Sequence, residues 1–556
     1  MKKYIAIFIV IAGCVAALSS CRKYESVPVE TVTPDYIWDA KDSNGVYASQ
    51  YLFSIYAALP QITSNRIGRD FLDAGSDDAV TSQTTAQSIT LLATNGITIF
   101  NNPDDAWASS YKGIRMATNF LNNFGAVPLK NVNEKRSWFG EARVMRAFFY
   151  WELVRRYGGV PILGDSLKTL EDNIEIPRSS FATCVNYIVN ECNRAADSLR
   201  DDPVDDANYG RFTKDAARAL KARVLLYAAS PLYNGGNIAD SLNGYDSYDA
   251  NRWKLAADAA KEIMNQGVYD LEENFIDIFI SQRSKEVIYA KTNTTGKTVE
   301  TTNGPINYAT APGSGNTSPT QELVDAYGMA NGLEINDPNS GYNPEDPYTG
   351  RDPRLGYTVL YNGAQWLNTP IQTYIGGINR PGGATVQTQT GYYLRKFMGH
   401  FENTTTYEDH YHDLIYFRYA DILLMYAEAM NEYAGPSDDV FAAVEKIRQR
   451  AGLNPYALDH GISKDSLRTV IRNERHKELA FEEQRYWDIR RWKIAGHVYN
   501  DAPLHAMNII NSPNGLVYNI QPVLTTAFDE SKMYFYPIPY NEVVSNENMR
   551  QNPGWQ

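Results

Sequence analysis

The stretch Arg146-Ala-Phe-Phe-Tyr-Trp-Glu-Leu-Val-Arg-Arg-Tyr-Gly-Gly-Val-Pro161 indicates how this chain folds. Its first part continues an amphipathic pattern that places Val144, Phe148 and Trp151 on one face of a helix. The consecutive glycines near the end of the stretch stop that helix. The pattern therefore predicts a helix over 137–157 with an aromatic face turned to the core.

Further helices are predicted on both sides of this one. Their apolar faces are rich in alanine with single large aromatic residues, a pattern typical of helices that pack closely in antiparallel pairs. No clean repeat of about 34 residues is present, so period alone does not establish a tetratricopeptide array. The predicted helices cover residues 107–123, 181–199, Thr213 up to Pro231, 252–266, 419–433, 437–451 and 465–492.

Two long segments differ in kind from the helices. Residues 292–319 and 332–411 are rich in Gly, Asn, Thr, Pro and Tyr and show few helical periods. Loops of this length in a compact domain usually carry function. Only short strands are expected, such as 286–291 and 534–536. The predicted fold class is therefore mostly α, with an irregular loop-rich part and few short strands.

The composition argues against two classes of protein. A net charge of −13 argues against nucleic acid as a partner, because phosphate backbones require clustered Lys and Arg. A mean hydropathy of −0.42, with no long apolar run after the N-terminus, argues against a polytopic membrane protein. The 39 Tyr and 9 Trp outnumber the 20 Phe, and such polar-tipped rings suit half-wet surfaces as well as cores.

The first residues predict export and a lipid anchor. Lys2 and Lys3 precede an apolar run over 5–18, which has the plan of a secretory signal peptide. The run closes with Leu-Ser-Ser-Cys21, which resembles a bacterial lipobox, so we expect residues 1–20 to be removed and Cys21 to be acylated. An ordinary signal peptide with an incidental cysteine is the alternative. Residues 21–34 are polar and rich in Val, Pro and Thr, as expected of an extended tether.

Two cysteines remain in the mature chain. Cys184 and Cys192 fall in one predicted helix, roughly 12 Å apart at about 1.5 Å per residue. A disulfide requires Cα atoms within about 7 Å, so we expect two buried free thiols.

Collinear blocks along nearly the whole mature chain resemble the SusD/RagB family. The stretch quoted above is similar to the family's N-terminal signature helix. The other matching blocks are Trp107 with 111–114, 213–223, 252–271, 319–327, 351–355, 417–431, 447–453, 474–492, 536–539 and 551–555.

The resemblance implies both a fold and a function. The fold is a right-handed superhelix of tetratricopeptide-like helix pairs, with an N-terminal helical region over 35–275 and a C-terminal region with long loops over 276–556. The function is capture of an oligosaccharide at the cell surface by a lipid-anchored outer-membrane protein. Family members act as a lid on a SusC-type TonB-dependent transporter. Some members bind peptides, which is the first alternative.

No catalytic template is present in the sequence. Glycoside hydrolysis needs two carboxylates about 5–10 Å apart, and the acidic pairs Asp77-Asp78 and Asp104-Asp105 are the only candidates singled out. Solvated loop acids or helix-start residues explain them better. A secreted glycan hydrolase is therefore a distant alternative, and a purely structural helical scaffold is the third.

Other charged groups are interpreted as scaffold. The 351–354 block is expected to brace a turn with buried ion pairs. The acids and arginines between Glu474 and Asp488, among them Glu478, Glu482 and Arg485, recur at helical spacing and are expected to pair with one another.

One local cluster offers possible metal ligands. It contains His400, Glu402, Glu408, Asp409, His410, His412 and Asp413. The spacing is weak and the acids favour a solvated loop, so we expect no metal site and no cofactor. A calcium or zinc site, with structural calcium the cofactor considered, is the minority alternative.

Ligand contacts are expected from aromatic rings and polar groups in the loops. A sugar has an apolar C–H face and a polar rim, so flat rings with amide, acid or guanidinium groups beside them form a suitable cradle. The residues chosen are Trp366, Tyr361, Tyr374 and Tyr342, with Tyr348 beside them, from the irregular segment, and Arg69, Asp78 and Asn101 from the N-terminal loop region. Trp366 is the first choice because it offers the largest flat surface in a polar setting.

Overall fold

The computed structural model describes residues 34–63, 66–83, 88–169, 171–235, 240–380 and 388–555. The signal peptide, Cys21 and nearly all of the tether predicted over 21–34 lie outside this range. Among the residues described, no helix is both long enough and apolar enough to cross a bilayer.

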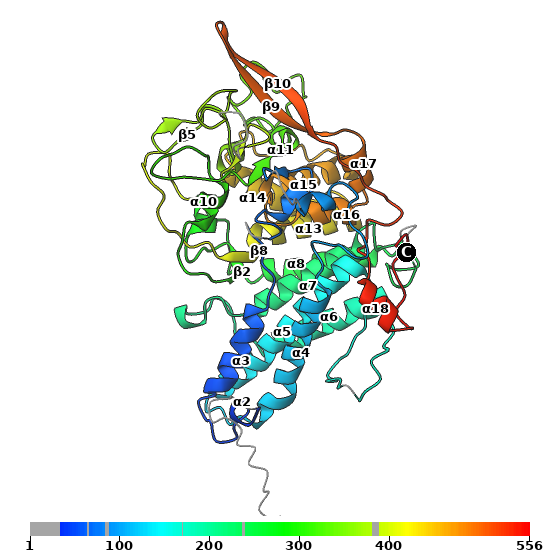
Figure 1. Ribbon diagram of the computed structural model, residues 1–556. Helices are drawn as coiled ribbons and strands as arrows, with labels where there is room; N and C mark the ends of the chain where they lie inside the picture. Colours follow the sequence, from blue (N-terminus) through cyan, green and yellow to red (C-terminus); the bar gives the residue numbers. More distant parts are fainter. Residues whose placement is uncertain are drawn as a thin grey trace, which may run out of the picture.

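The molecule is mostly helical, and consecutive helices pack side by side (Figure 1). α4 packs on α5, and the series continues through α6, α7 and α8 to α13, which also contacts α14 and α15. This confirms the mostly α fold class. The longer helices are α3 (Val46–Ala57), α4 (Trp107–Asn123), α5 (Val132–Tyr157), α6 (Phe181–Ala196), α7 (Lys214–Ala229), α8 (Asn251–Met264), α13 (Tyr419–Ala434), α14 (Asp438–Arg450) and α15 (Lys464–Glu478). The shorter ones are α2 (Pro34–Ile37), α9 (Asp277–Ile280), α10 (Thr298–Asn303), α11 (Gln321–Ala326), α12 (Arg354–Thr358), α16 (Arg485–Arg491), α17 (Ala495–Asn500) and α18 (Tyr540–Ser545).

Local signals in the sequence set the helix ends. The Asn131 side chain caps α5 by accepting hydrogen bonds from the main chain of Asn133 and Glu134, both at 3.1 Å. The helix ends at Gly158, whose φ of 76° favours glycine. α5 thus begins five residues before the predicted start at 137 and ends where predicted. Cys184 and Cys192 on α6 are buried free thiols, as predicted.

The single helix predicted over 465–492 is wrong. The structure has α15 and α16 there, separated by a break in which Phe481 and Glu483 adopt positive φ angles of 62° and 58°. The break turns the Phe481 ring fully into the core. It also places Glu482 against the guanidinium of Arg418, 2.7 Å away. Core packing and a buried ion pair therefore override the helical pattern.

The strands form five two-stranded antiparallel sheets among the described residues. The predicted strand over 286–291 is confirmed as β2, which pairs with β8. The predicted strand over 534–536 is wrong, because Tyr536 donates its main-chain N–H to the carbonyl of Arg156 at 2.7 Å and joins no ladder. The β9–β10 hairpin is not predicted at all. The strands are β1 (Ala79–Thr81), β2 (Val287–Lys291), β3 (Thr317–Pro319), β4 (Val359–Leu360), β5 (Gln365–Trp366), β6 (Thr369–Pro370), β7 (Tyr393–Leu394), β8 (Leu414–Arg418), β9 (Leu504–Ser512) and β10 (Gly515–Leu524).

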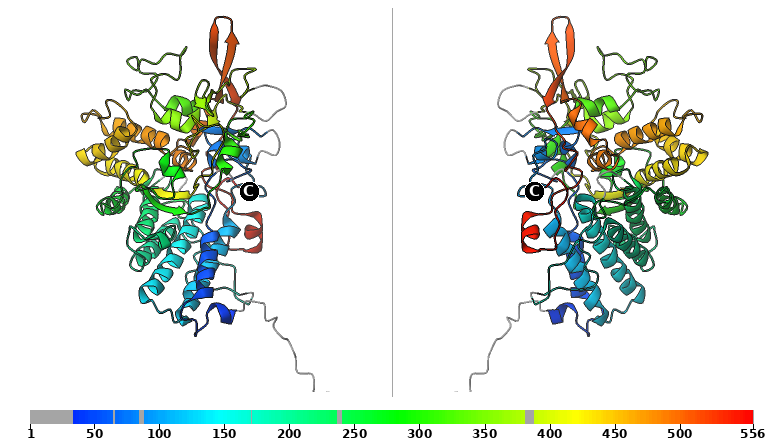
Figure 2. Two further views of the ribbon diagram at one scale, coloured as in Figure 1. Left: turned by 90° about the vertical axis from the view of Figure 1, so that its left-hand side faces the viewer. Right: turned by 90° about the vertical axis from the view of Figure 1, so that its right-hand side faces the viewer.

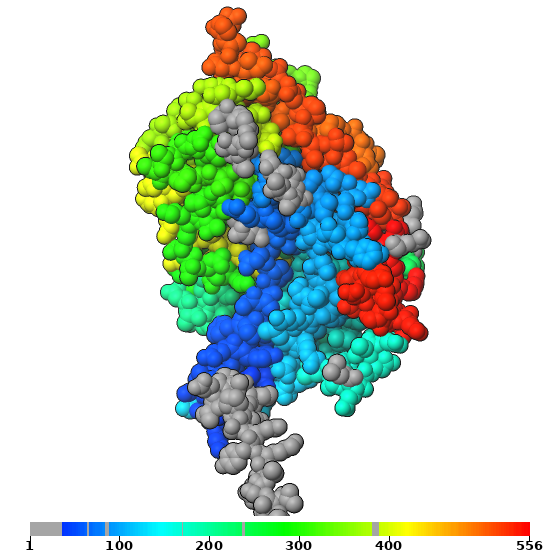
Figure 3. Space-filling model, in the orientation of Figure 1, coloured from blue at the N-terminus to red at the C-terminus, as the bar shows by residue number. Residues whose placement is uncertain are grey.

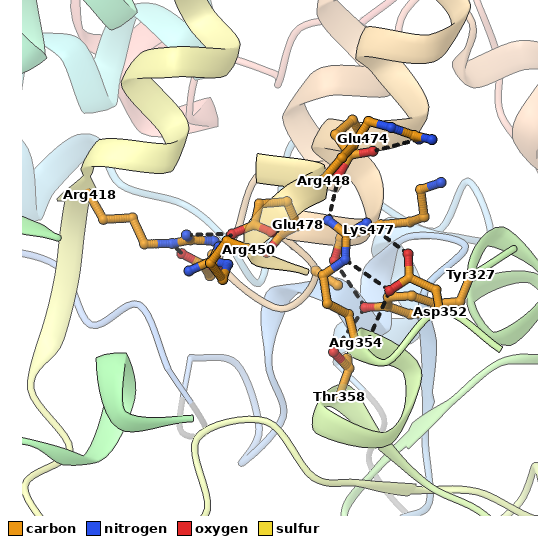
Figure 4. A network of polar contacts seen from close by, with 12 residues as sticks. Tyr327, Asp352, Arg354, Thr358, Arg418, Arg448, Arg450, Glu474, Lys477 and Glu478 are labelled. Atoms are coloured by element: carbon orange, nitrogen blue, oxygen red, sulfur yellow. Dashed lines mark hydrogen bonds and ion pairs between the residues drawn. The ribbon is translucent and has the colours of Figure 1, made fainter. Parts of the chain in front are cut away.

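Buried ion pairs brace the C-terminal half (Figure 4). Arg354 pairs with Glu474 at 2.5 Å and with Glu478 at 3.1 Å. Glu478 also accepts from Arg418 at 2.8 Å and from Arg450. All five side chains are buried, so each charge depends on its partners for compensation. The predicted structural network is therefore present.

Two residues of that prediction bond elsewhere. Arg485 reaches Asp77 in the N-terminal half, with a 2.6 Å contact, instead of an acid on its own helix. Arg351 pairs with no acid among the described residues and donates to main-chain carbonyls, including that of Pro347 at 2.7 Å. The guanidinium of Arg351 therefore braces the turn through the backbone.

Candidate ligand-binding site

A pocket of about 320 Å³ lies between the loop before α4 and the start of α18. Two aromatic rings dominate it: Phe100 is 76% exposed and Tyr540 is 44% exposed. Their centroids are 4.8 Å apart and their planes meet at 48°. Figure 3 shows the residues near 100, in light blue, against the C-terminal residues, in red, on this face. We call this the Phe100 pocket.

A tight turn holds Phe100 outward. The Thr98 N–H donates to the Asn101 carbonyl at 3.0 Å, and the Asn101 N–H donates to the Thr98 hydroxyl at 3.0 Å. The same hydroxyl accepts from the N–H of Phe100 at 3.3 Å. These hydrogen bonds within the turn fix its backbone, and in this conformation the Phe100 ring is exposed to solvent.

A buried acid ties the two walls of the pocket together. Asp104, beside the first wall, accepts from Arg156 at 3.0 Å and from the hydroxyl of Tyr536, beside the second wall, at 3.0 Å. Arg66 completes the charge compensation. Although burial disfavours ionisation, Arg156 and Arg66 hold the pKa of Asp104 well below its usual range. The spacing of the walls is therefore fixed before a ligand arrives.

Amide groups surround the rings. Asn101, Asn102 and Asn541 line the pocket together with Asp105. The Asn102 Nδ2 atom is buried and has no hydrogen-bond partner among the described residues. The lining contains one acid and no base. Exposed rings, amides and the absence of positive charge suit a neutral, hydroxyl-rich ligand such as a saccharide.

Of the ligand contacts predicted from the sequence, Asn101 lies in this pocket. Arg69 is exposed, with φ of 77°, but does not line the pocket. Asp78 was expected on a ligand face, and this is wrong. Its side chain is fully buried, and its Oδ1 atom lies 2.5 Å from His476 Nε2 on α15. The acid joins the two halves of the chain instead.

Trp366 was also expected on an exposed face, and this is wrong. The ring is 0% exposed. Its indole N–H donates to the hydroxyl of Tyr407 at 3.2 Å, and Phe401 packs edge-on at 5.6 Å. The short β5–β6 hairpin turns the ring inward, with Leu367 and Asn368 in left-handed conformations at its bend. The polar neighbours in sequence belong to the hairpin, so they do not report the environment of the ring.

The four predicted tyrosines are half-buried and do not line the Phe100 pocket. Tyr361 stacks on Tyr348, with centroids 4.4 Å apart. The ring of Tyr342 lies under the Arg351 guanidinium at 5.3 Å, and the Tyr374 hydroxyl donates to Gln372 at 2.9 Å. The structure therefore does not gather all the predicted contacts in one pocket.

A second, more open hollow of about 470 Å³ lies in the first of the two predicted long loops. Its main aromatic group is Tyr308, whose hydroxyl lies 3.3 Å from the Thr369 hydroxyl. Asn307 beside it donates to the carbonyl of Ile378 at 2.6 Å. This hollow offers one half-buried ring, compared with two exposed rings in the Phe100 pocket.

The acidic pairs were expected to be solvated loop acids or helix-start residues, and for three of the four acids this is wrong. Asp77, Asp78 and Asp104 are buried against Arg485, His476 and Arg156 respectively. Asp105 alone behaves as expected: it is exposed, and it accepts from the N–H of Trp107 at the start of α4 at 2.9 Å.

The histidine cluster does not converge on one point. His400 lies 2.9 Å from Asp277, and His412 lies 3.1 Å from Glu300. Among the described residues, the group close enough to share a cation is Asp77, Asp78 and His476. Its members already pair with Arg485 and with each other.

Comparison with known proteins defines the class. Residues 278–555 match the SusD family, and residues 39–226 match a family described as starch-binding and associating with the outer membrane. The chain is 25% identical to SusD-like protein P2 of Formosa agariphila, over all of both chains. The chain therefore belongs to the SusD family.

Two solved structures share the fold. A SusD-like protein from Bacteroides fragilis is 27% identical, with a TM-score of 0.78 over 94% of this chain and 99% of that one. A SusD-like carbohydrate binding protein from the same species is 23% identical, with a TM-score of 0.74 over 92% of this chain and all of that one.

Sequence reasoning missed Phe100 and Tyr540. Phe100 stands in a Thr-Ile-Phe-Asn-Asn-Pro run whose turn residues give a usable signal. Tyr540 follows a Pro-Ile-Pro run far along the chain, and nothing local indicates that it meets Phe100.

Proposed function

We propose that this protein binds a neutral oligosaccharide in the Phe100 pocket and delivers it to a SusC-type TonB-dependent transporter in the outer membrane. The observation that carries the proposal is the pair of exposed rings of Phe100 and Tyr540, held by a preformed turn and surrounded by amides. Rings of this kind contact the C–H face of a sugar, while the amides bond its hydroxyls.

Family membership supports the ligand class. A structural relative is described as a carbohydrate binding protein. The absence of a basic residue from the pocket lining favours a neutral glycan over a sulfated or uronic one. A peptide ligand is the alternative within the family, and a panel of both ligand types separates the two.

The test compares three variants by calorimetric titration against neutral glycans, acidic glycans and peptides. Loss of an anchoring aromatic ring commonly costs about 2 kcal/mol, roughly a thirtyfold loss of affinity. Phe100→Ala should therefore weaken binding of a neutral glycan about thirtyfold. The melting temperature should be unchanged, because the ring is 76% exposed.

Two matched variants locate the site. Tyr248 is 62% exposed and lies outside the pocket, so Tyr248→Ala should bind normally. If Tyr308→Ala weakens binding and Phe100→Ala does not, the glycan occupies the loop hollow and the pocket assignment is wrong. Preference for peptides across the panel would contradict the ligand class.

The proposal includes three further claims: the protein does not cleave the glycan, it carries a lipid anchor, and it works with a transporter. Mass analysis should return the bound glycan intact. Cys21→Ala should leave an unprocessed or soluble protein, whereas normal membrane retention would contradict acylation at Cys21. A SusC-like barrel should co-purify in mild detergent, and the pair should bind glycan more tightly than the lone protein. Full affinity without a barrel would contradict the delivery role.

A further inference from the structure

The β9–β10 hairpin stands out beyond the rest of the molecule in both views of Figure 2. In Figure 1 it lies at the end opposite α2. Its two strands pair from Ser512↔Gly515 at the tip towards the body, with a register shift only near Pro522. The hairpin thus forms an arm attached at one end.

The body holds one edge of this arm. Along β9, the Met507 N–H donates to the Thr390 carbonyl at 2.8 Å, and the Ile509 carbonyl accepts from the N–H of Ile375 at 2.9 Å. In an antiparallel pair, the main-chain groups of successive residues point alternately toward the partner strand and away from it. Met507 and Ile509 therefore point away from β10.

The register then fixes the free edge. Ile520 is the partner of Met507, and Tyr518 is the partner of Ile509. In an antiparallel ladder, the main-chain groups of two partner residues either face each other or both face outward. Since those of Met507 and Ile509 face outward, those of Ile520 and Tyr518 point away from β9. No main-chain hydrogen bond joins this side of β10 to another described residue. β10 therefore presents an unpaired edge.

The outer part of this edge, residues 516–520, lacks the usual protection. Charged residues form 21% of the chain, but none lies between Asp501 and Asp529. Sheet edges are commonly protected by Lys, by inward-pointing charges or by Pro along the strand. Here Val517 is 45% exposed and Ile520 is 54% exposed, and the one proline of β10, Pro522, lies toward its base. An exposed, uncharged edge is suited to pairing.

The occupant follows from charge and area. Two copies of a chain with net charge −13 repel each other, and one strand edge contributes much less than the roughly 1,200 Å² buried in a stable interface. An uncharged segment avoids the charge repulsion, and its main chain alone matches the edge. We propose that β10 binds an extended, uncharged segment of another protein as a third strand.

Side-chain alternation specifies the segment further. Tyr518 and Ile520 lie on one face of β10, and Val517 and Asn519 lie on the other. The added strand would contact apolar groups on the first face and mixed groups on the second. A segment of alternating apolar and small polar residues fits this edge.

The test uses the full-length protein in its own cells, with a photocrosslinking phenylalanine analogue in place of Val517. The crosslinked peptide, mapped by mass spectrometry, should come from an uncharged segment of one other protein. The same analogue at Leu255 on α8, which is 54% exposed, gives the background.

Two edge variants identify strand addition. Ile520→Pro removes an outward N–H without touching the β9 ladder, so it should reduce the crosslink at least tenfold. Ile520→Lys keeps that N–H but adds a charge to the edge, and it should also reduce the crosslink. This second variant keeps the test valid if the proline disturbs the hairpin. Ile520→Val should retain the crosslink.

The opposite results would overturn the proposal. They are a crosslink no stronger than the Leu255 background, a crosslink to a second copy of this chain, a charged partner segment, or a crosslink that persists in both edge variants.

Discussion

Replacing Glu478 by Gln removes the negative charge that three buried arginines share. Glu478 is fully buried on α15 and pairs with Arg354, Arg418 and Arg450. Although burial disfavours a charge there, the three guanidiniums hold the pKa of this carboxyl well below its usual range. Gln keeps the shape of the side chain but replaces one of the two accepting oxygens by an NH2 group, so the substitution removes the charge together with one acceptor.

The structure sets the size of the effect. Breaking a buried ion pair from one side costs about 3–5 kcal/mol, because the remaining charge is left uncompensated. Here each arginine keeps another acid: Arg354 retains Asp352 and Glu474, and Arg418 and Arg450 both retain Glu286. We therefore expect the lower end of the range, about 3 kcal/mol of lost stability.

Urea unfolding at pH 7, followed by tryptophan fluorescence, measures the change as a lower midpoint. The matched control is Asp258→Asn, which breaks the exposed Lys254–Asp258 pair on α8 and should leave the midpoint unchanged. An unchanged midpoint for Glu478→Gln would refute the argument that the network stabilises the C-terminal half.

Two further predictions concern the core and acid stability. Trp366→Ala should destabilise the protein by about 3–5 kcal/mol and leave the glycan affinity of the folded protein unchanged; weaker binding with an unchanged melting temperature would place this ring in the ligand site. Although burial disfavours their charged forms, Arg223 and Arg475 lower the pKa of Asp421 to about 2, and Arg491 lowers that of Glu428 to about 2. Since unfolded carboxyls titrate near about 4, this stabilisation is complete above about pH 5 and is lost as the pH falls to about 2. Melting temperatures between pH 6 and pH 2 should fall accordingly, and a flat profile would contradict the role of these pairs.

The helices could be predicted because their signals are local. α4 runs from Trp107 to Asn123, as the apolar spacing indicates, and α7 begins directly after the Thr213 cap. The α15–α16 break could not be predicted, because the acids that follow α15 form ion pairs with arginines far away in the sequence, as Glu482 does with Arg418. A pattern read along one helix does not contain that partner.

The site was less predictable for the same reason. Asn101 could be placed by region, but Tyr540 reaches Phe100 only through the packing of the C-terminal segment on the first helices. Trp366 and Asp78 show the opposite error. Both have polar neighbours in sequence, yet both are buried. Trp366 hydrogen-bonds to Tyr407 and Asp78 to His476, and these partners are distant along the chain. Burial depends on such long-range contacts, which composition does not report.

The buried acids also bear on the choice between binding and hydrolysis. A glycosidase holds two carboxylates across its ligand, one of them able to exchange a proton. Asp104 is the acid nearest in sequence to Asp105, but it is 2% exposed and is kept ionised by Arg156 and Arg66. It therefore braces the pocket, with its carboxylate paired to these two guanidiniums. Asp105 is the one carboxylate in the lining, so the described residues of this pocket do not offer the pair of acids that a glycosidase uses, which supports the proposed binding role.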